Sequence, residues 1–207
     1  MTQQKRLGWV LVLNLVMITG LVLVGLRSDS FSVLAAAGDF VADSAAILLG
    51  LIAIRISKDP RGNPKATSYV AFLNSLVLLT LTIFIIFGSV DRLAGHAQSV
   101  KGLPVLIVSA VAAGSMLIGT LILGAQAATE DLHMRSVWLD TVSDGVTSAV
   151  VAVSGLIIWR TNRFFWLDSA LAIVIGLVIC FTALDLLLKT LKSLRSDENI
   201  PFKPFKG

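Results

Sequence analysis

The amino-acid composition of this chain is that of a protein embedded in lipid. Its 207 residues are 56% hydrophobic and 14% charged, with a mean hydropathy of +0.86, and soluble domains carry about 25% charged residues. The net charge of +4 is expected at the rim of a bilayer, where basic residues meet anionic lipid, and does not resemble a nucleic-acid surface. The composition excludes a soluble globular domain and predicts an all-α integral membrane protein.

Six apolar runs are each long enough, at about 20 residues, to cross a bilayer as a helix. In chain order they cover residues 7–26, 31–56, 66–90, 103–125, 134–159 and 164–188. We expect 1–195 to form one six-helix transport domain and 196–207 a short polar tail. The first run is too long for a signal-peptide core and lacks a small-x-small cleavage site before Arg27, so we expect it to be retained.

The distribution of Lys and Arg predicts the orientation of the helices. If the N-terminus is cytoplasmic, the inner segments hold twelve of the 17 Lys and Arg residues and the outer segments hold five. Cytoplasmic segments of membrane proteins carry an excess of these residues. We therefore expect both termini in the cytoplasm and a multi-pass protein of a bacterial plasma membrane.

The second and fifth runs each contain two Asp residues four positions apart, Asp39 with Asp43 and Asp140 with Asp144. Residues at i and i+4 share one helix face, with Cβ atoms about 5–6 Å apart. Insertion scales assign about 2.5–3.5 kcal/mol to each Asp at mid-bilayer, so the four cost roughly 10 kcal/mol or more unless they are neutralised. A cation, protons, or the two in alternation would neutralise them, which predicts transport of a divalent metal ion.

The two pairs are expected at the same depth. The second helix reaches its pair roughly 15 Å from the outer edge, and the fifth reaches its pair roughly 12 Å from the inner edge, at 1.5 Å per residue. In a hydrocarbon core about 30 Å thick these levels agree. Because the helices are antiparallel, Asp39 should face Asp144 and Asp43 should face Asp140, so four carboxylates could form a tetrahedral cage around a metal ion.

Small residues continue the same faces. Ala46, Gly50, Ala53 and Ser57 follow the Asp stripe of the second helix. Ser136, Thr147, Ser148 and Gly155 lie along the stripe of the fifth. Small residues let helices approach closely in lipid, so we expect these stripes to face each other.

Segment 30–57 contains FSVLAAAGDFVADSAAILLGLIAIRIS, and segment 133–184 contains MRSVWLDTVSDGVTSAVV followed by WLDSALAIVIGLVI. These segments resemble the second, fifth and sixth helices of the cation diffusion facilitators. Residues 71–74 resemble the start of the third helix of that family, and Asn14 matches a polar position in its first helix. The resemblance covers the chain to about Leu194. It implies metal efflux by proton antiport, with Asp39, Asp43, Asp140 and Asp144 as ligands, and a homodimer.

The chain departs from the family pattern in three ways. It ends at Gly207, whereas family members usually continue into a cytoplasmic metal-binding domain, so we expect that domain to be lacking. The loop 58–67 has no His, which argues against an accessory site there. All four ligand positions are Asp, and oxygen ligands suit Mn²⁺, whereas affinity order favours Zn²⁺. The cargo is left open among Zn²⁺, Mn²⁺, Co²⁺, Cd²⁺ and Fe²⁺.

Exchange of metal for protons follows from the clustered carboxylates. Mutual repulsion and lost solvation both favour the protonated form, and the groups should titrate as a coupled set. A divalent cation replaces the protons because its charge restores the ionised state. Loading from inside and reprotonation from outside would export metal, provided that the site faces each side in turn.

Other polar residues are expected to have structural roles. His133 and His96 should be interfacial, and the single cysteine, Cys180, should be a small packing residue. Asp168 opens the sixth helix and suits its dipole, and Asp185 should pair with Lys189. Asn14 and Asn74 should form interhelical hydrogen bonds.

Two other functions use buried carboxylates. An intramembrane aspartyl protease needs two Asp on separate helices, but Ala36 stands where its Gly-x-Gly-Asp signature requires the first Gly. A proton-coupled exporter of organic cations is the stronger alternative, although such a cavity needs aromatic residues and only Phe40 and Trp138 lie near the pairs. We expect a transporter with no enzymatic activity and no resident cofactor.

Overall fold

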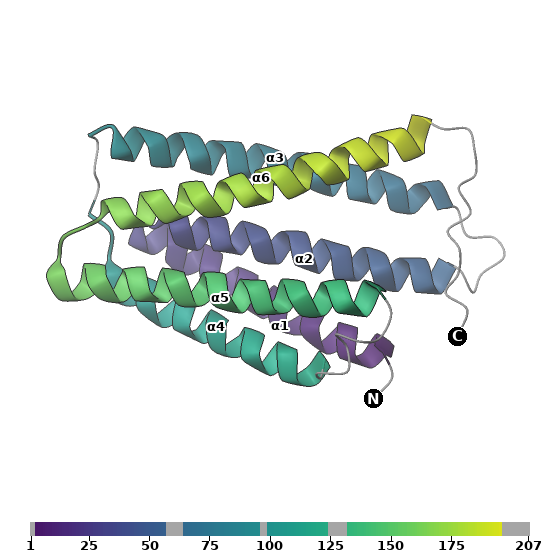
Figure 1. The fold of residues 1–207 in the computed structure, drawn as a ribbon, viewed down its shortest axis with the longest axis horizontal. Coiled ribbons are helices and arrows are strands. Elements are labelled where there is room, and N and C mark those ends of the chain that lie inside the picture. The colour runs from purple at the N-terminus through teal and green to yellow at the C-terminus, as the bar shows by residue number, and fades with distance from the viewer. Residues whose placement is uncertain (1–2, 57–63, 96–98, 124–131, 196–207) are drawn as a thin grey trace.

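The computed structural model describes residues 3–56, 64–95, 99–123 and 132–195, and helices are the only regular elements in these ranges (Figure 1). The helices are α1 (Gln3–Ser28), α2 (Phe31–Ile56), α3 (Pro64–Leu93), α4 (Gly102–Leu123), α5 (Leu132–Thr161) and α6 (Trp166–Arg195). All six are long and apolar enough to cross a membrane. The predicted six-helix membrane fold is confirmed, and the polar tail at 196–207 lies outside the described residues.

The helices run along one common direction, with α2 at the centre of the bundle (Figure 1). α2 contacts α1, α3, α5 and α6. α3 pairs with α6, and α4 packs against α1 and α5. The start of α1 and the end of α6 lie at the same end of the bundle (Figure 1), as an even number of spans requires. We refer to this end as the inner end, following the predicted orientation.

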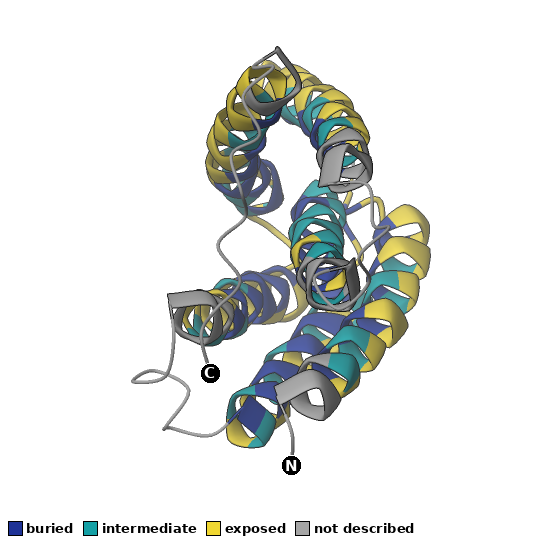
Figure 2. Cartoon of the chain, turned by 90° about the vertical axis from the view of Figure 1, so that its right-hand side faces the viewer, coloured by how far each residue is buried: buried dark blue, intermediate teal, exposed yellow. Residues whose placement is uncertain are grey.

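The outer surface of the bundle is apolar. Figure 2 shows buried residues turned toward neighbouring helices and exposed residues turned outward. Large apolar side chains are among the most exposed, for example Leu121 at 79% and Phe181 at 76%. An extended exposed apolar surface is expected where a protein contacts lipid rather than water.

Backbone geometry and hydroxyl groups define the tight turn between α1 and α2. Asp29 has a positive φ of 55°, and the Ser30 N–H donates to the carbonyl of Gly25 at 3.1 Å, which is the bond of a Schellman motif. The Ser30 hydroxyl then accepts the Val33 N–H at 3.2 Å and caps the start of α2. The turn thus fixes where α2, which carries the first Asp pair, begins.

The turn between α5 and α6 is set by two residues with positive φ. Asn162 has φ of 47° and Phe164 has φ of 61°, and the Asn162 N–H donates to the Ile158 carbonyl at 2.8 Å. This left-handed conformation ends α5. The sixth helix therefore begins at Trp166 rather than at Phe164, where the apolar run predicted its start.

α4 and α5 approach most closely at two glycines. A Cβ atom at Gly102 would lie 2.4 Å from the Trp159 nitrogen, and one at Gly155 would lie 2.7 Å from the Leu106 nitrogen. Backbone-to-backbone contact of this kind requires residues without side chains. Gly155 thus packs against α4, whereas its stripe was expected to face α2.

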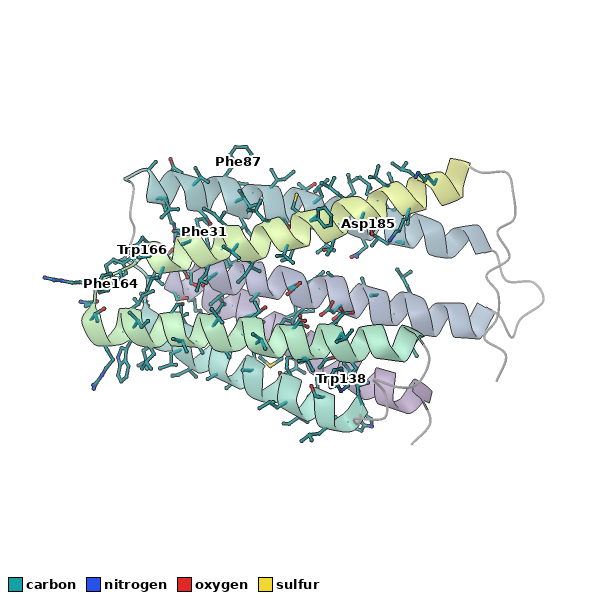
Figure 3. The ribbon with its side chains drawn as sticks, in the orientation of Figure 1. Phe31, Phe87, Trp138, Phe164, Trp166 and Asp185 are labelled. Atoms are coloured by element: carbon teal, nitrogen blue, oxygen red, sulfur yellow. The ribbon has the colours of Figure 1, made fainter. Side chains whose placement is uncertain are left out.

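Aromatic side chains gather at the outer end of the bundle. Figure 3 shows Phe31, Phe164 and Trp166 at this end and Trp138 in the opposite half. The Arg92 guanidinium lies 3.9 Å from the centre of the Phe31 ring, in cation–π range. Aromatic residues near the ends of spans are typical of the membrane interface.

Candidate metal site

α2 and α5 pack against each other and bring the four predicted Asp residues together. The carboxyl groups of Asp39 and Asp43 both form hydrogen bonds with that of Asp144. Asp140 interacts electrostatically with Asp43 and Asp144. Asp39 contacts Asp144 as the antiparallel spacing predicted, whereas Asp43 forms its hydrogen bond with Asp144 and only an electrostatic interaction with its predicted partner Asp140.

The four carboxyl groups differ in their exposure. Asp144 is buried, with 5% of its surface exposed, while Asp39 and Asp43 are partly buried and Asp140 is exposed. A hydrogen bond between two carboxyl groups needs a proton on one of them. A proton on Asp144 would therefore serve the contacts with both Asp39 and Asp43.

The carboxylates interact in pairs rather than as a preformed cage. Within the described ranges, no three His, Cys, Asp or Glu side chains are arranged so that they could hold one metal ion. Asp140 projects to the exposed side, and Asp39 and Asp43 converge on the same partner. Side-chain rotation would be needed before four oxygens could surround a cation, so the tetrahedral cage stays a prediction.

Apolar clusters close the bundle on both sides of the carboxylates. The outer cluster packs residues of five helices, including Met17, Phe40, Met116, Val151 and Ile179. The inner cluster consists of Val10, Ile47 and Leu123, with Leu11, Leu51 and Trp138 packed against it. Asp43 and Asp144 lie in the layer between these two clusters, while Asp39 lies beside Phe40 of the outer cluster.

Several buried oxygens share this layer. The hydroxyls of Ser44, next to Asp43, and of Ser148, one turn beyond Asp144, are buried and have no hydrogen-bond partner among the described residues. The same holds for the side-chain oxygen of Asn14 on α1. The expected hydrogen bond for that Asn14 oxygen is thus missing, and the layer is richer in oxygens than the two DxxxD motifs suggested.

The predicted stripes of small residues are only partly packed. Thr147 is partly buried and Ser148 is buried, but Ala46 is exposed. The side chains of Ser136 on α5 and of Gly50, Ala53 and Ser57 on the α2 stripe lie outside the described set. The carboxylates, rather than a continuous small-residue face, therefore mark the α2–α5 contact.

Asp168 is fully buried and caps a helix other than its own. Its Oδ1 accepts hydrogen bonds from the hydroxyls of Ser30 and Ser32 at 2.5 Å each, and its Oδ2 accepts the Phe31 N–H at 2.8 Å. An anion at a helix N-terminus interacts favourably with the exposed N–H groups and the dipole. Asp168 thus has a structural role, as predicted, but it caps the start of α2 rather than that of its own helix, α6. Ser30 and Ser32, at the start of the second apolar run, were the feature of the sequence that could have indicated this cap.

The remaining polar residues lie away from the carboxylates where they are described. Lys189 pairs with Asp185 at 2.5 Å on the exposed surface of α6, as predicted. Cys180 is a free, partly buried thiol. The side chains of His96 and His133 fall outside the described residues.

Comparison with known proteins identifies relatives over most of the chain. A family described as "Cation efflux transmembrane domain" matches residues 9–195. The zinc transporter ZitB of Pectobacterium atrosepticum is 27% identical over 198 residues, which cover 92% of this chain. The "Cadmium, cobalt and zinc/H(+)-K(+) antiporter" of Bacillus velezensis is 24% identical over 82% of the chain.

A third relative is the metal cation efflux system protein CzcD of Cupriavidus metallidurans, which is 26% identical over 74% of the chain. The matched regions cover 61%, 57% and 49% of the lengths of these three relatives. The chain thus spans about half, or slightly more, of the length of each of these relatives.

Proposed function

Because the chain belongs to the cation efflux family, whose transmembrane domain matches residues 9–195, we propose that it exports a divalent transition-metal cation from the cytoplasm. The observation that carries this proposal is the cluster that Asp39 and Asp43 of α2 form with Asp140 and Asp144 of α5. Carboxylates in lipid mark ion pathways by default. The printed names of the relatives, which refer to zinc, cadmium and cobalt, support a cargo of this class.

The four Asp residues are the proposed ligands. An all-oxygen site accepts Mn²⁺ readily, and carboxylates also bind Zn²⁺ at ordinary distances. The relatives named as zinc transporters favour Zn²⁺ as the first cation to test. The same assay extended to Mn²⁺, Co²⁺, Cd²⁺ and Fe²⁺ would rank the cargo.

Proton antiport is the proposed energy source. The contacts of Asp39 and Asp43 with Asp144 suit a set of groups that shares protons when no cation is bound. A divalent cation displaces those protons on loading, and protons from outside displace the cation.

We also propose that the protein works as a homodimer with both termini in the cytoplasm.

The proposal is tested by metal flux into proteoliposomes. Replacement of Asp43 or Asp144 by Ala is expected to abolish metal flux, because each replacement removes one of the proposed ligands. Insertion of the protein into the membrane should be unchanged. Asp185→Ala is the matched control, since Asp185 is an exposed carboxylate paired with Lys189, and its flux should equal that of the wild type.

Wild-type flux in both Asp43→Ala and Asp144→Ala would refute the four-ligand site. Flux of organic cations that is lost in the same variants, without flux of any metal, would favour the alternative transporter. Metal flux that is lost in the Asp185→Ala control as well would mean that the assay reports folding rather than the site.

A further inference from the structure

Asn14 is a buried amide whose carbonyl oxygen is unsatisfied. The residue is 2% exposed, and its Oδ1 has no hydrogen-bond partner in the part of the chain that the structure describes. Burying a carbonyl oxygen without a partner is unfavourable because the lost hydration is not replaced. A ligand that binds to this oxygen would remove the penalty.

Asn14 lies at the depth of the carboxylates. Gly25 of α1 packs against Leu34 of α2, since a Cβ atom at Gly25 would lie 2.8 Å from the Leu34 side chain. The helices are antiparallel and rise equally per residue. Moving the same number of residues inward from this contact reaches Asn14 on α1 and Ala45 on α2, two positions beyond Asp43.

The apolar clusters place Asn14 in the same layer independently. On the buried face of α1, Asn14 lies between Val10 of the inner cluster and Met17 of the outer cluster. Asp43 on α2 and Asp144 on α5 occupy the corresponding gap in their helices. The Asn14 amide therefore lies between the inner and the outer apolar cluster, at the same level as Asp43 and Asp144.

We propose that the side-chain oxygen of Asn14 is a further cation-binding oxygen, which adds a neutral ligand from α1 to the carboxylates of α2 and α5. This inference rests on the proposed function, because it adds a residue to the same site. Amide carbonyl oxygens are ordinary ligands of hard divalent cations. Mn²⁺ favours six oxygens, whereas Zn²⁺ is satisfied by four ligands, so Asn14 should matter more for Mn²⁺.

The test is calorimetric titration of the full chain in detergent with Mn²⁺ and with Zn²⁺. Asn14→Leu is expected to lower the affinity for Mn²⁺ by about 10-fold or more, as loss of groups around a metal site typically does, and the affinity for Zn²⁺ by less. Asn14→Asp adds a carboxylate and should raise both affinities. The melting temperature of Asn14→Leu should equal or exceed that of the wild type, because an unsatisfied polar group is removed.

Ser109→Ala is the matched control. Ser109 is also buried with an unpartnered oxygen, but it lies beside Val108 of the outer cluster, and its replacement should leave both affinities unchanged. If Asn14→Leu binds both cations with wild-type affinity while Asp43→Ala loses binding, the proposed role of Asn14 would be overturned and the carboxylate site would stand. If Asn14→Leu does not fold, unchanged affinities in Asn14→Asp would overturn it. A wild-type chain that binds neither cation would overturn the proposed function as well.

Discussion

At the scale of single residues, Asp168 connects two helices that are distant in sequence. It lies in the first turn of α6, yet its carboxylate receives the Phe31 N–H and two serine hydroxyls at the start of α2. α2 carries Asp39 and Asp43, so the cap fixes the outer end of the helix that presents half of the carboxylate cluster.

Loss of this cap should destabilise the bundle. A hydrogen bond to a charged group contributes about 1.5–3 kcal/mol to stability. Asp168→Ala removes several such hydrogen bonds at a fully buried position. The substitution is therefore expected to lower the free energy of unfolding by about 3 kcal/mol or more. The measurement is the melting temperature in detergent, which should fall clearly.

The control for Asp168 is another carboxylate of α6. Asp185 forms an exposed ion pair with Lys189, and exposed pairs contribute about 0–1 kcal/mol. Asp185→Ala should therefore leave the melting temperature nearly unchanged. Equal melting temperatures for the Asp168 and Asp185 variants would show that the cap does not stabilise the α2–α6 contact.

At the scale of elements, the α4–α5 contact depends on two glycines. A Cβ atom at Gly155 would lie 2.7 Å from the Leu106 backbone, and overpacking of this kind costs about 1–3 kcal/mol. Gly155→Ala is expected to lower the melting temperature and the metal flux together, because α5 carries Asp140 and Asp144 and would be displaced.

Gly114→Ala on α4 is the matched substitution. A Cβ atom at Gly114 would meet nothing within 4 Å, and Ala gains roughly 0.5–1 kcal/mol over Gly inside a helix. Its melting temperature should therefore hold or rise. A Gly155→Ala protein as stable as Gly114→Ala would show that the helices can separate there without loss.

The sequence predicted the helices well because apolar runs of spanning length have few other structures in lipid. It also predicted the level of the two Asp pairs, because helical rise is constant. It did not predict which helix each face meets. Gly155 packs on α4 and Ala46 is exposed, since periodicity identifies residues that share a face but not the neighbour of that face.

Local backbone geometry was also beyond the apolar pattern. The start of α6 at Trp166 follows from positive φ at Asn162 and Phe164, and a large aromatic residue in that conformation carries no sequence signal. Asn14 was expected to form a hydrogen bond because polar residues in lipid need partners, but its oxygen lacks one among the described residues. This unsatisfied oxygen is the basis for the proposed role of Asn14 as a further ligand.

At the scale of the whole molecule, six spans place the start of α1 and the end of α6 at one end (Figure 1). Asp43 and Asp144 lie between an inner and an outer apolar cluster, so a cation exported through the proposed site would pass one cluster to enter and the other to leave. Exchange with protons requires that access alternates between the two sides. The bias of Lys and Arg toward the inner end predicts that this end faces the cytoplasm.

The most direct test of the account is metal flux driven by a pH gradient in proteoliposomes with the membrane potential clamped. Protons and metal compete for the same carboxylates, so metal affinity should fall as pH falls, and acid on the side opposite the metal should accelerate flux. Metal uptake should be accompanied by proton movement in the opposite direction, and both should vanish in Asp144→Ala. Metal flux that is indifferent to the gradient and moves no protons would contradict exchange at this site.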